Sequence, residues 1–272
     1  MKGNQRNLDQ LRNHYEVEKE LAARLLKSSR AERTRLFHTL YDELFARVPD
    51  HPRLTRRNEA GSSERAVAAQ MALLRGQLEG VRTFLEFAPG DCRLSFEVCR
   101  FVEKVYAVDI SDQTGGVASR PPNFELILYD GYHLDLPPQA IDLAFSYQFL
   151  EHLHPDDVNP HFQMIKRLLR PGGAYLFSTP HRYSGPHDIS AHFSDVPQGF
   201  HFKEWTYLEL GEVLEAAGFA AWFTYRFGHP RCSKLANGLT LAVESAFGLL
   251  PRRLQRRVSR RLFQGVTMMA IS

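Results

Sequence analysis

The period of the hydrophobic pattern changes at about residue 81, and this change constrains the fold more than any other feature of the sequence. Beyond it, short apolar runs alternate with helical stretches, expected at 160–169 and 205–217, and such alternation builds a parallel sheet with helices on both faces. Five runs predict parallel strands, at 83–87, 104–108, 124–129, 141–146 and 173–178. Two more, at 221–227 and 265–271, bring the predicted count to seven. The sequence therefore predicts an α/β fold with a mostly parallel, seven-stranded sheet.

The first eighty residues carry a helical pattern instead. Ser29 and Glu32 offer a capping box for a second helix, after apolar residues that recur at helical spacing from the start of the chain. A third helix is expected over 63–79. We therefore predict an N-terminal helical extension over 1–80, followed by one sheet domain over 81–272.

Composition and charge exclude several classes of protein. Apolar residues make up 43% and charged residues 24%, which is ordinary for a globular chain, and a net charge of +3 is too small to imply a nucleic-acid partner. No window approaches the roughly 18 apolar residues of a transmembrane helix, and we expect no signal peptide. An odd number of cysteines without metal-type pairing favours reduced thiols in a cytoplasmic protein. These cysteines are Cys92, Cys99 and Cys232.

Acidic side chains stand at the predicted carboxyl ends of three successive strands. They are Glu86, Asp109 and Asp130. Ligands of an open parallel sheet bind at this edge, where a carboxylate such as Asp109 can accept hydrogen bonds from both hydroxyls of a ribose. Asp130 could accept one from the exocyclic amine of adenine. Three such carboxylates suit a nucleoside that carries no phosphate.

Six segments carry a resemblance to a known family through their order and spacing. They are FLEFAPGDC at 84–92, VYAVDIS at 105–111, DG followed by LP within 130–137, IDLAFS followed by LEHL within 141–153, LLRPGG at 168–173 and FKEWT at 202–206. Over roughly 81–272 the chain resembles the class I S-adenosylmethionine-dependent methyltransferases. The resemblance implies a Rossmann-like fold, S-adenosylmethionine as the cofactor and methyl transfer as the activity.

The resemblance also implies which residues contact the cofactor. The residues implied to contact the methionine part are Glu86, Ala88, Pro89 and Gly90. The residues implied to contact the nucleoside are Asp109, Ile110, Asp130 and Gly131. The residues implied to line the site of methyl transfer are Ser146, Tyr147 and Gln148. Ala88 and Cys92 stand where the family usually has glycine. A pyrophosphate needs several glycines to approach a helix N-terminus, so a nicotinamide-dependent oxidoreductase is less favoured.

Histidines are frequent where an acceptor is expected to bind. A hydroxyl acceptor would be helped by a general base, and we predict His181 first, because it lies nearest the end of its strand, and His152 second. The connection over 179–203 is long enough to be a lid or clamp. Within it, Tyr183, His187 and Asp188 are candidates to orient a substrate. We predict no metal, because no cysteine or carboxylate lies at a familiar interval from the histidines.

The N-terminal extension and an insert over about 230–264 fall outside the sheet pattern. Extensions in similar enzymes often cover the acceptor, so Tyr41 and the loop at 47–57 are candidates for substrate selection, with an interaction role equally open. Within the insert, residues 252–261 contain six arginines beside leucines, which predicts a basic amphipathic helix. Such a helix, with 247–263 as its contact segment, either lies on an anionic membrane or docks on the domain with a solvated arginine face.

We therefore expect a methyltransferase that acts through oxygen on a small molecule, a sugar or another glycan, or a lipid-linked intermediate, in the cytoplasm or at the inner face of a membrane. The alternative from another class is a non-catalytic scaffold or sensor that binds S-adenosylmethionine or another nucleoside. The altered glycine loop favours this alternative, and the histidine-rich connection opposes it. The acceptor, the atom methylated and the oligomeric state stay open.

Overall fold

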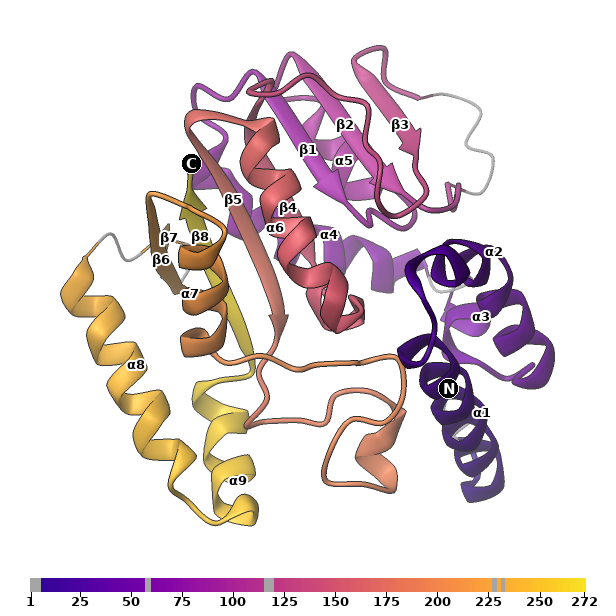
Figure 1. The fold of residues 1–272 in the computed structure, drawn as a ribbon. Coiled ribbons are helices and arrows are strands. Elements are labelled where there is room, and N and C mark those ends of the chain that lie inside the picture. Colours follow the sequence, from indigo (N-terminus) through magenta and orange to yellow (C-terminus); the bar gives the residue numbers. More distant parts are fainter. Residues whose placement is uncertain (1–5, 57–59, 115–119, 227–228, 231–232) are drawn as a thin grey trace.

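A mixed β-sheet forms the centre of the molecule. The computed structural model describes residues 6–56, 60–114, 120–226, 229–230 and 233–272, so Cys232 and residue 57 lie outside it. The strands are β1 Thr83–Phe87, β2 Lys104–Asp109, β3 Phe124–Leu128, β4 Ile141–Tyr147, β5 Leu169–Pro180, β6 Ala221–Arg226, β7 His229–Pro230 and β8 Gly265–Ile271. Their order across the sheet is β3-β2-β1-β4-β5-β8-β6-β7 (Figure 1).

The predicted mostly parallel sheet is confirmed. The pairs from β3 through β5 are parallel, and β8 runs antiparallel to both β5 and β6. All seven predicted strands are present, and the two-residue β7 is an additional strand too short to give a periodic signal. The register places Phe87 opposite Val108 of β2 and Ser146 of β4, so the carboxyl ends of these strands meet at one edge.

Helices cover both faces of the sheet and extend beyond one end. They are α1 Leu8–Leu26, α2 Arg30–Arg47, α3 Pro52–Arg56, α4 Ala60–Leu74, α5 Arg93–Val98, α6 Pro155–Leu168, α7 Tyr207–Ala216, α8 Lys234–Gly248 and α9 Arg252–Leu262, with the 3-10 turns η1 Arg75–Gln77, η2 Leu150–His152 and η3 Ile189–His192. The predicted capping box at Ser29 and Glu32 is present. In the described ranges, no helix has the length and apolar character needed to cross a bilayer.

Two helices differ from prediction at both of their ends. Helix α6 begins at Pro155, ahead of the expected residue 160, because the His154 side chain accepts a hydrogen bond from the Asp156 amide and caps the helix there. Its end also moves, since Leu169 already pairs with Ile141 in the sheet. The third predicted helix starts earlier, at residue 60, and its last turn tightens into η1.

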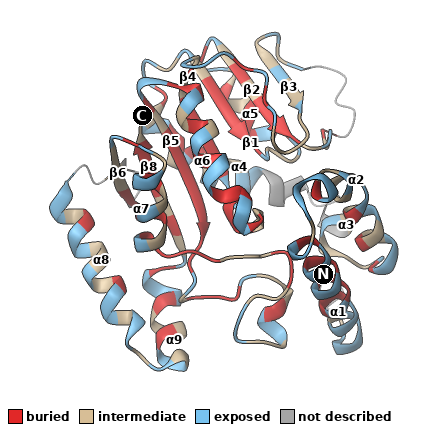
Figure 2. Cartoon of the chain, in the orientation of Figure 1, coloured by how far each residue is buried: buried red, intermediate tan, exposed pale blue. Residues whose placement is uncertain are grey.

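The hydrophobic core lies on the two faces of the sheet. On one face, rings of Phe87 and Tyr175 pack with Phe162 of α6, and on the other face Phe84 and Phe145 pack with residues of α4 and α5. Figure 2 shows the buried residues concentrated in the central strands. This burial on both faces is what a parallel sheet requires.

The N-terminal helices have a small core of their own and lie at the carboxyl edge of the sheet (Figure 1). Leu21 of α1 and Leu44 of α2 belong to a third cluster that includes Phe200, from the long connection between β5 and α7. The Arg33 side chain of α2 donates to Tyr132 and Asp157 of the sheet domain. The extension therefore packs against the edge where strand ends meet.

Candidate active site

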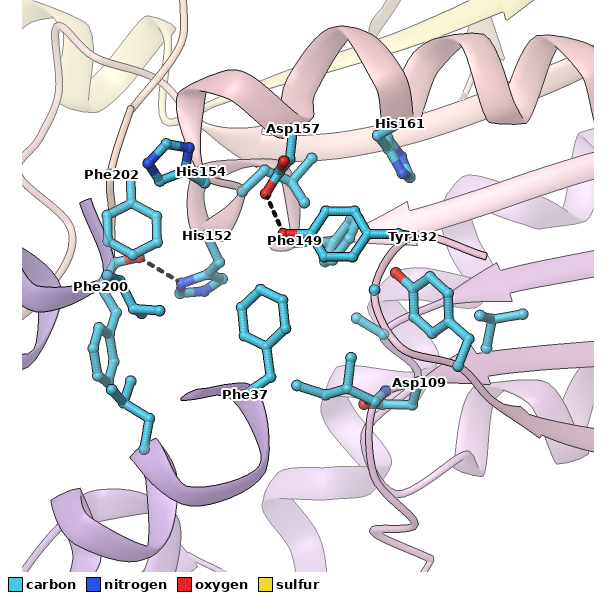
Figure 3. Close-up of a pocket in the computed structure, with 18 of the residues that line it drawn as sticks. Phe37, Asp109, Tyr132, Phe149, His152, His154, Asp157, His161, Phe200 and Phe202 are labelled. Atoms are coloured by element: carbon cyan, nitrogen blue, oxygen red, sulfur yellow. Dashed lines mark hydrogen bonds between the residues drawn. The ribbon is translucent and has the colours of Figure 1, made fainter. Parts of the chain in front are cut away.

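A cavity of about 350 Å³ lies at the carboxyl edge of the sheet, beneath α2 (Figure 3). Its walls combine the loops after β1, β2, β3 and β4 with residues of α2 and of the connection between β5 and α7. Seven residues that the sequence assigned to the cofactor line it: Ala88, Gly90, Asp109, Ile110, Gly131, Tyr147 and Gln148. The ends of β1 to β4 therefore converge on one cavity, although Asp109 is the one predicted acidic residue that lines it.

The loop after β1 keeps the conformation of a glycine-rich loop despite its two substitutions. Ala88, Gly90 and Cys92 all have φ between 52° and 59°, in the left-handed region. A non-glycine residue there costs roughly 1–2 kcal/mol. The Ala88 amide donates to the carbonyl of Val108, which ties the loop to the end of β2. Alanine at 88 and cysteine at 92 therefore add backbone strain, while both residues keep the left-handed conformation that glycine would adopt.

Of the three carboxylates at strand ends, Asp109 is the one that lines the cavity. Its Oδ1 accepts hydrogen bonds from the amides of Ile110 at 2.7 Å and Ser111 at 3.3 Å. Burial raises the pKa of this carboxyl, while those backbone amides act in the opposite direction. The bonds to the backbone hold the side chain in one orientation at the end of β2.

Four other predicted cofactor residues lie behind the cavity wall. Glu86 is buried and accepts a hydrogen bond from the Ser95 hydroxyl, and its burial raises the pKa of the carboxyl to about 7. Ser146 is bonded to the Tyr175 hydroxyl at 2.7 Å. Asp130 accepts bonds from two backbone amides and from the His133 ring, which stabilise the turn after β3. The fourth residue is Pro89, which also does not line the cavity.

Aromatic rings make up much of the cavity wall. They belong to Phe37, Tyr41, Tyr129, Tyr132, Tyr147, Phe149, Phe200 and Phe202. In Figure 3 the ring of Phe37 extends from α2 into the cavity, with Asp109 on one side and His152 on the other. A Cβ on Gly131 would approach the Phe37 ring to 3.1 Å, and Gly131 has φ +88°, so glycine is required here.

His152 is the predicted catalytic histidine that reaches the cavity. Its Nδ1 lies 2.9 Å from the carbonyl oxygen of Phe200, and because a carbonyl only accepts, Nδ1 carries the hydrogen and Nε2 is the acceptor nitrogen. Burial, with His201 nearby, lowers the pKa of His152 to about 3. The imidazole is therefore neutral near pH 7, and its lone pair can contact a ligand.

The geometry does not support His181 as the base. The side chain is 0% exposed, is absent from the cavity wall and pairs through Nε2 with Oε1 of Glu244 on α8 at 2.7 Å. The same Glu244 carboxylate accepts the amides of Tyr207 and Leu208 at the start of α7. His181 is the nearest histidine to the end of β5, but β8 and the insert cover that strand end.

The candidate substrate residues of the long connection also lie outside the cavity. Asp188 accepts the amides of Ser190 and Gly199, and His187 bonds to the Ser184 hydroxyl, so both stabilise the connection itself. The third residue, Tyr183, is also absent from the cavity wall. Tyr41 is the member of the predicted substrate set that lines it. Phe200 and Phe202 reach the cavity from this connection and were missed, because a loop has no period that marks its inward residues.

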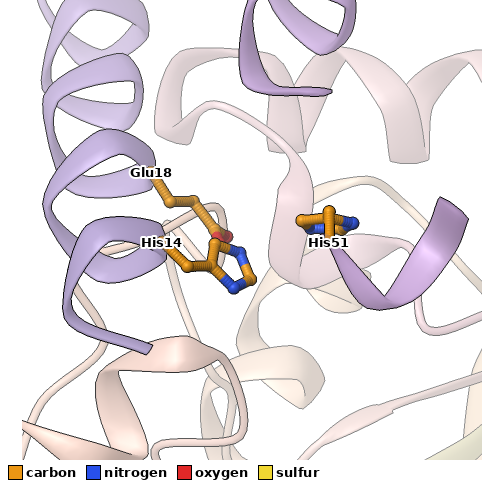
Figure 4. A group of neighbouring side chains, drawn as sticks. All are labelled: His14, Glu18 and His51. Atoms are coloured by element: carbon orange, nitrogen blue, oxygen red, sulfur yellow. The ribbon is translucent and has the colours of Figure 1, made fainter. Parts of the chain in front are cut away.

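Two groups of side chains have the composition of a metal site in the described part of the chain. One is Glu151, His152 and His201; the other is His14, Glu18 and His51 (Figure 4). In each group the ligand atoms lie within 4.8 Å of one another. Sequence intervals led us to predict no metal site, because each group joins two segments that are far apart in the chain.

Comparisons with known proteins agree on one family. Residues 85–177 match the family described as "Methyltransferase domain". A protein of Mycolicibacterium smegmatis named as a probable S-adenosylmethionine-dependent methyltransferase is 32% identical over 143 residues, which are 51% of this chain and 52% of that protein. The chain thus spans about half the length of this curated relative.

Two solved structures show the same fold. The 1,6-didemethyltoxoflavin-N1-methyltransferase of Burkholderia thailandensis, with 1,6-didemethyltoxoflavin and S-adenosylhomocysteine bound, has a TM-score of 0.53 and 21% identity, over 94% of this chain and 90% of its own. A methyltransferase of Archaeoglobus fulgidus, described as SAM dependent, has a TM-score of 0.52 and 16% identity, over 76% of this chain and 94% of its own. At these identities the similarity concerns the fold.

Proposed function

We propose that the chain is a class I S-adenosylmethionine-dependent methyltransferase that transfers a methyl group to a small molecule, because residues 85–177 match the methyltransferase domain family and half of the chain is 32% identical to a probable S-adenosylmethionine-dependent methyltransferase. The observation that carries this proposal is the continuity of one cavity from the loops after β1 and β2 to the aromatic rings under α2. Its volume of about 350 Å³ lies in the usual range of small-ligand sites. The same cavity therefore adjoins both the proposed donor site and the aromatic residues of the proposed acceptor site.

The donor would bind along the strand ends. In this proposal Asp109 accepts hydrogen bonds from the ribose hydroxyls, the loop from Ala88 to Gly90 lies along the methionine part, and Gly131 adjoins the adenine. Glu86, Pro89, Asp130 and Ser146 act from behind this wall by holding the loops in place. Tyr147 and Gln148, at the end of β4, line the boundary between donor and acceptor.

The acceptor would be flat and apolar around its reacting group. Aromatic walls favour such a molecule over a free sugar, because a flat ring can stack on aromatic faces. The B. thailandensis enzyme is an N1-methyltransferase, whereas for this chain we propose oxygen as the nucleophile, because neutral His152 offers an acceptor nitrogen to a hydroxyl. In transfer, the oxygen bonds to the methyl carbon while the carbon–sulfur bond breaks, its electrons stay on sulfur and the hydroxyl proton leaves to water.

Substitution of Asp109 tests the cofactor site. Calorimetry with S-adenosylhomocysteine should detect binding by the parent, and Asp109→Ala should weaken it roughly 10- to 100-fold, as expected for loss of hydrogen bonds to a charged group. Glu125→Gln, at an exposed carboxylate on β3, should bind as the parent does. No binding by the parent, or equal binding by Asp109→Ala, would contradict the proposal.

A methyl-labelled cofactor with a panel of acceptors tests the reaction itself. We expect label in phenols or hydroxylated heterocycles and none in free sugars. Label in amines alone would overturn oxygen as the nucleophile. Binding of the cofactor with no transfer to any acceptor would favour the scaffold or sensor alternative.

We also propose that α9 contacts an anionic membrane surface, where a partly apolar acceptor would be concentrated. Arg253, Arg257, Arg260 and Arg261 are exposed on this helix, and Leu254 lies exposed among them. Leu249, in the turn before α9, is 88% exposed. Cationic and apolar side chains on one face are the combination that binds the surface of anionic lipid.

A further inference from the structure

Three metal-ligating side chains meet at the wall of the acceptor part of the cavity. Glu151 and His152 belong to η2, and His201 lies in the connection that precedes α7. We propose that these three residues bind a divalent transition-metal ion. Binding of the ion stands on the geometry alone, while its action on an acceptor rests on the proposed function.

Each of the three ligands is oriented by a partner on its other polar atom. His152 donates from Nδ1 to the carbonyl of Phe200 at 2.9 Å, and His201 donates from Nδ1 to Oε1 of Glu204 at 3.0 Å. Oε2 of Glu151 accepts from the Thr179 hydroxyl at 2.9 Å. These bonds leave Nε2 of each imidazole as the lone-pair nitrogen, as in metal sites where outer partners orient the histidines.

The remaining carboxylate oxygen of Glu151 is a buried acceptor that needs a partner. The residue is 0% exposed, and Oε1 has no hydrogen-bond donor in the described part of the chain. It lies 4.0 Å from Nε2 of His152, which is too far for a hydrogen bond. Two tetrahedral ligands that each lie about 2.1 Å from one ion are roughly 3.4 Å apart, so the two side chains would close by about 0.6 Å around the ion. A cation would satisfy this oxygen.

Glu204 supports the site from behind. Its Oε1 accepts hydrogen bonds from the His201 ring and from the His187 amide. Its Oε2 packs against Gly185 so closely that a Cβ added to this glycine would lie 1.7 Å from the oxygen. Gly185 therefore leaves the space that this carboxylate fills. A carboxylate bonded to the far nitrogen of a histidine raises the basicity of the ligating nitrogen.

The ligand set indicates the class of ion. Two imidazoles with one carboxylate suit zinc, iron(II), cobalt(II) or manganese(II) better than calcium or magnesium, which prefer oxygen. Three protein ligands leave coordination positions open, and His152 lines the cavity, so an open position would face the acceptor. With an ion bound, Nε2 of His152 would be its ligand, so the ion would replace this nitrogen as the contact to the acceptor. A hydroxyl bound there would lose its proton to water more readily, and its oxygen would then form the bond to the methyl carbon.

The other group of metal-type side chains is His14, Glu18 and His51 (Figure 4). The Arg6 guanidinium donates to Nδ1 of His14 at 2.8 Å, so Nε2 carries the hydrogen and faces Glu18 at 2.7 Å. The second oxygen of Glu18 accepts the amide of Phe200 at 2.9 Å. His14 therefore offers no lone pair to an ion in this arrangement, and it serves as the matched control.

Cobalt(II) titration of the chelator-treated full chain tests the proposal. Visible absorption and calorimetry should report one ion per chain, and His201→Ala should weaken binding at least roughly 100-fold, while His14→Gln leaves it unchanged. Thr179→Val keeps all three ligands but removes the hydrogen bond that orients Glu151, and the loss of such a bond should weaken cobalt binding roughly 10-fold. This variant tests the site if His201→Ala does not fold. Asp109→Ala should keep cobalt while losing S-adenosylhomocysteine, which separates failure of this site from failure of the proposed function.

Three results would overturn the metal site. They are no cobalt bound by the parent, binding retained by both His201→Ala and Thr179→Val, and binding lost in His14→Gln.

Discussion

Glu86 lies beneath the cavity, where its carboxylate accepts a hydrogen bond from the Ser95 hydroxyl. Its burial raises the pKa of the carboxyl from the ordinary 4.5 to about 7, so the folded protein binds this proton more tightly than the unfolded chain. The resulting stabilisation is complete below about pH 4.5 and is lost as the pH rises through 7. For this span the linked free energy is on the order of 3 kcal/mol.

Glu86→Gln should remove that pH dependence, because the amide oxygen can still accept from Ser95 and the side chain no longer ionises. Urea unfolding at pH 5 and pH 8 should show the free energy of unfolding falling about 2–3 kcal/mol less in the variant than in the parent. Glu97→Gln, at a carboxylate paired with Arg100 on the surface, should keep the parental dependence. Equal slopes for Glu86→Gln and the parent would show that the carboxyl does not titrate in this range.

Helix α2 is held over the cavity by a buried cation. Arg33 is 3% exposed and donates to the Tyr132 hydroxyl at 3.0 Å, to Oδ1 of Asp157 at 3.0 Å and to the carbonyl of Ser28 at 2.7 Å. The Tyr132 hydroxyl donates in turn to Asp157. This network joins the N-terminal extension to the turn after β3 and to the start of α6.

Arg33→Met should destabilise the protein by about 3–5 kcal/mol, because it leaves the Asp157 carboxylate buried without its cation. We expect faster hydrogen exchange in α2 and weaker binding of acceptors, measured by exchange mass spectrometry and calorimetry. Arg24→Met removes an exposed pair with Glu43 and should cost less than about 1 kcal/mol. Similar losses in both variants would mean that Arg33 does not hold the helix in place.

Across the whole molecule, charge is unevenly distributed. The net charge of +3 is small, yet six arginines of α9 line one surface hollow. Arg252 donates to the carbonyls of Arg182 and Asp195, and Arg256 pairs with Asp195, so these two dock the helix on the connection before α7. The more exposed arginines are left to face solvent or a partner.

The intact protein should bind vesicles that contain the anionic lipid phosphatidylserine and should not bind vesicles of phosphatidylcholine alone. Each arginine near an anionic surface contributes about 1 kcal/mol, so reversing Arg253, Arg257 and Arg261 to glutamate should lower partitioning roughly 100-fold or more. The same change at Arg75, Arg82 and Arg100 matches the net charge and should have a much smaller effect. Absence of binding in sedimentation assays, or equal loss in both triple variants, would remove the membrane contact.

The sequence by itself determined the sheet and the donor side of the cavity. Short apolar runs mark the strands, and parallel strands bring their carboxyl ends to one edge, which was enough to predict Asp109 at the site. The family resemblance, and not the strand order, implied Gly90 and Gly131. The spacing of Ser29 and Glu32 likewise predicted the capping box of α2, which the structure contains. Such features depend on neighbouring residues and on a fixed period.

The acceptor side was decided by tertiary structure. His181 and His152 both follow strand ends, but β5 is flanked by β8 and covered by the insert through Glu244, whereas β4 lies beside β1 at the cavity. Periodicity marks which face of a strand or helix is buried, and a long connection has no period. The meeting of His201 with Glu151, and of Phe37 with Gly131, therefore depends on the path of the chain between elements, which only packing determines.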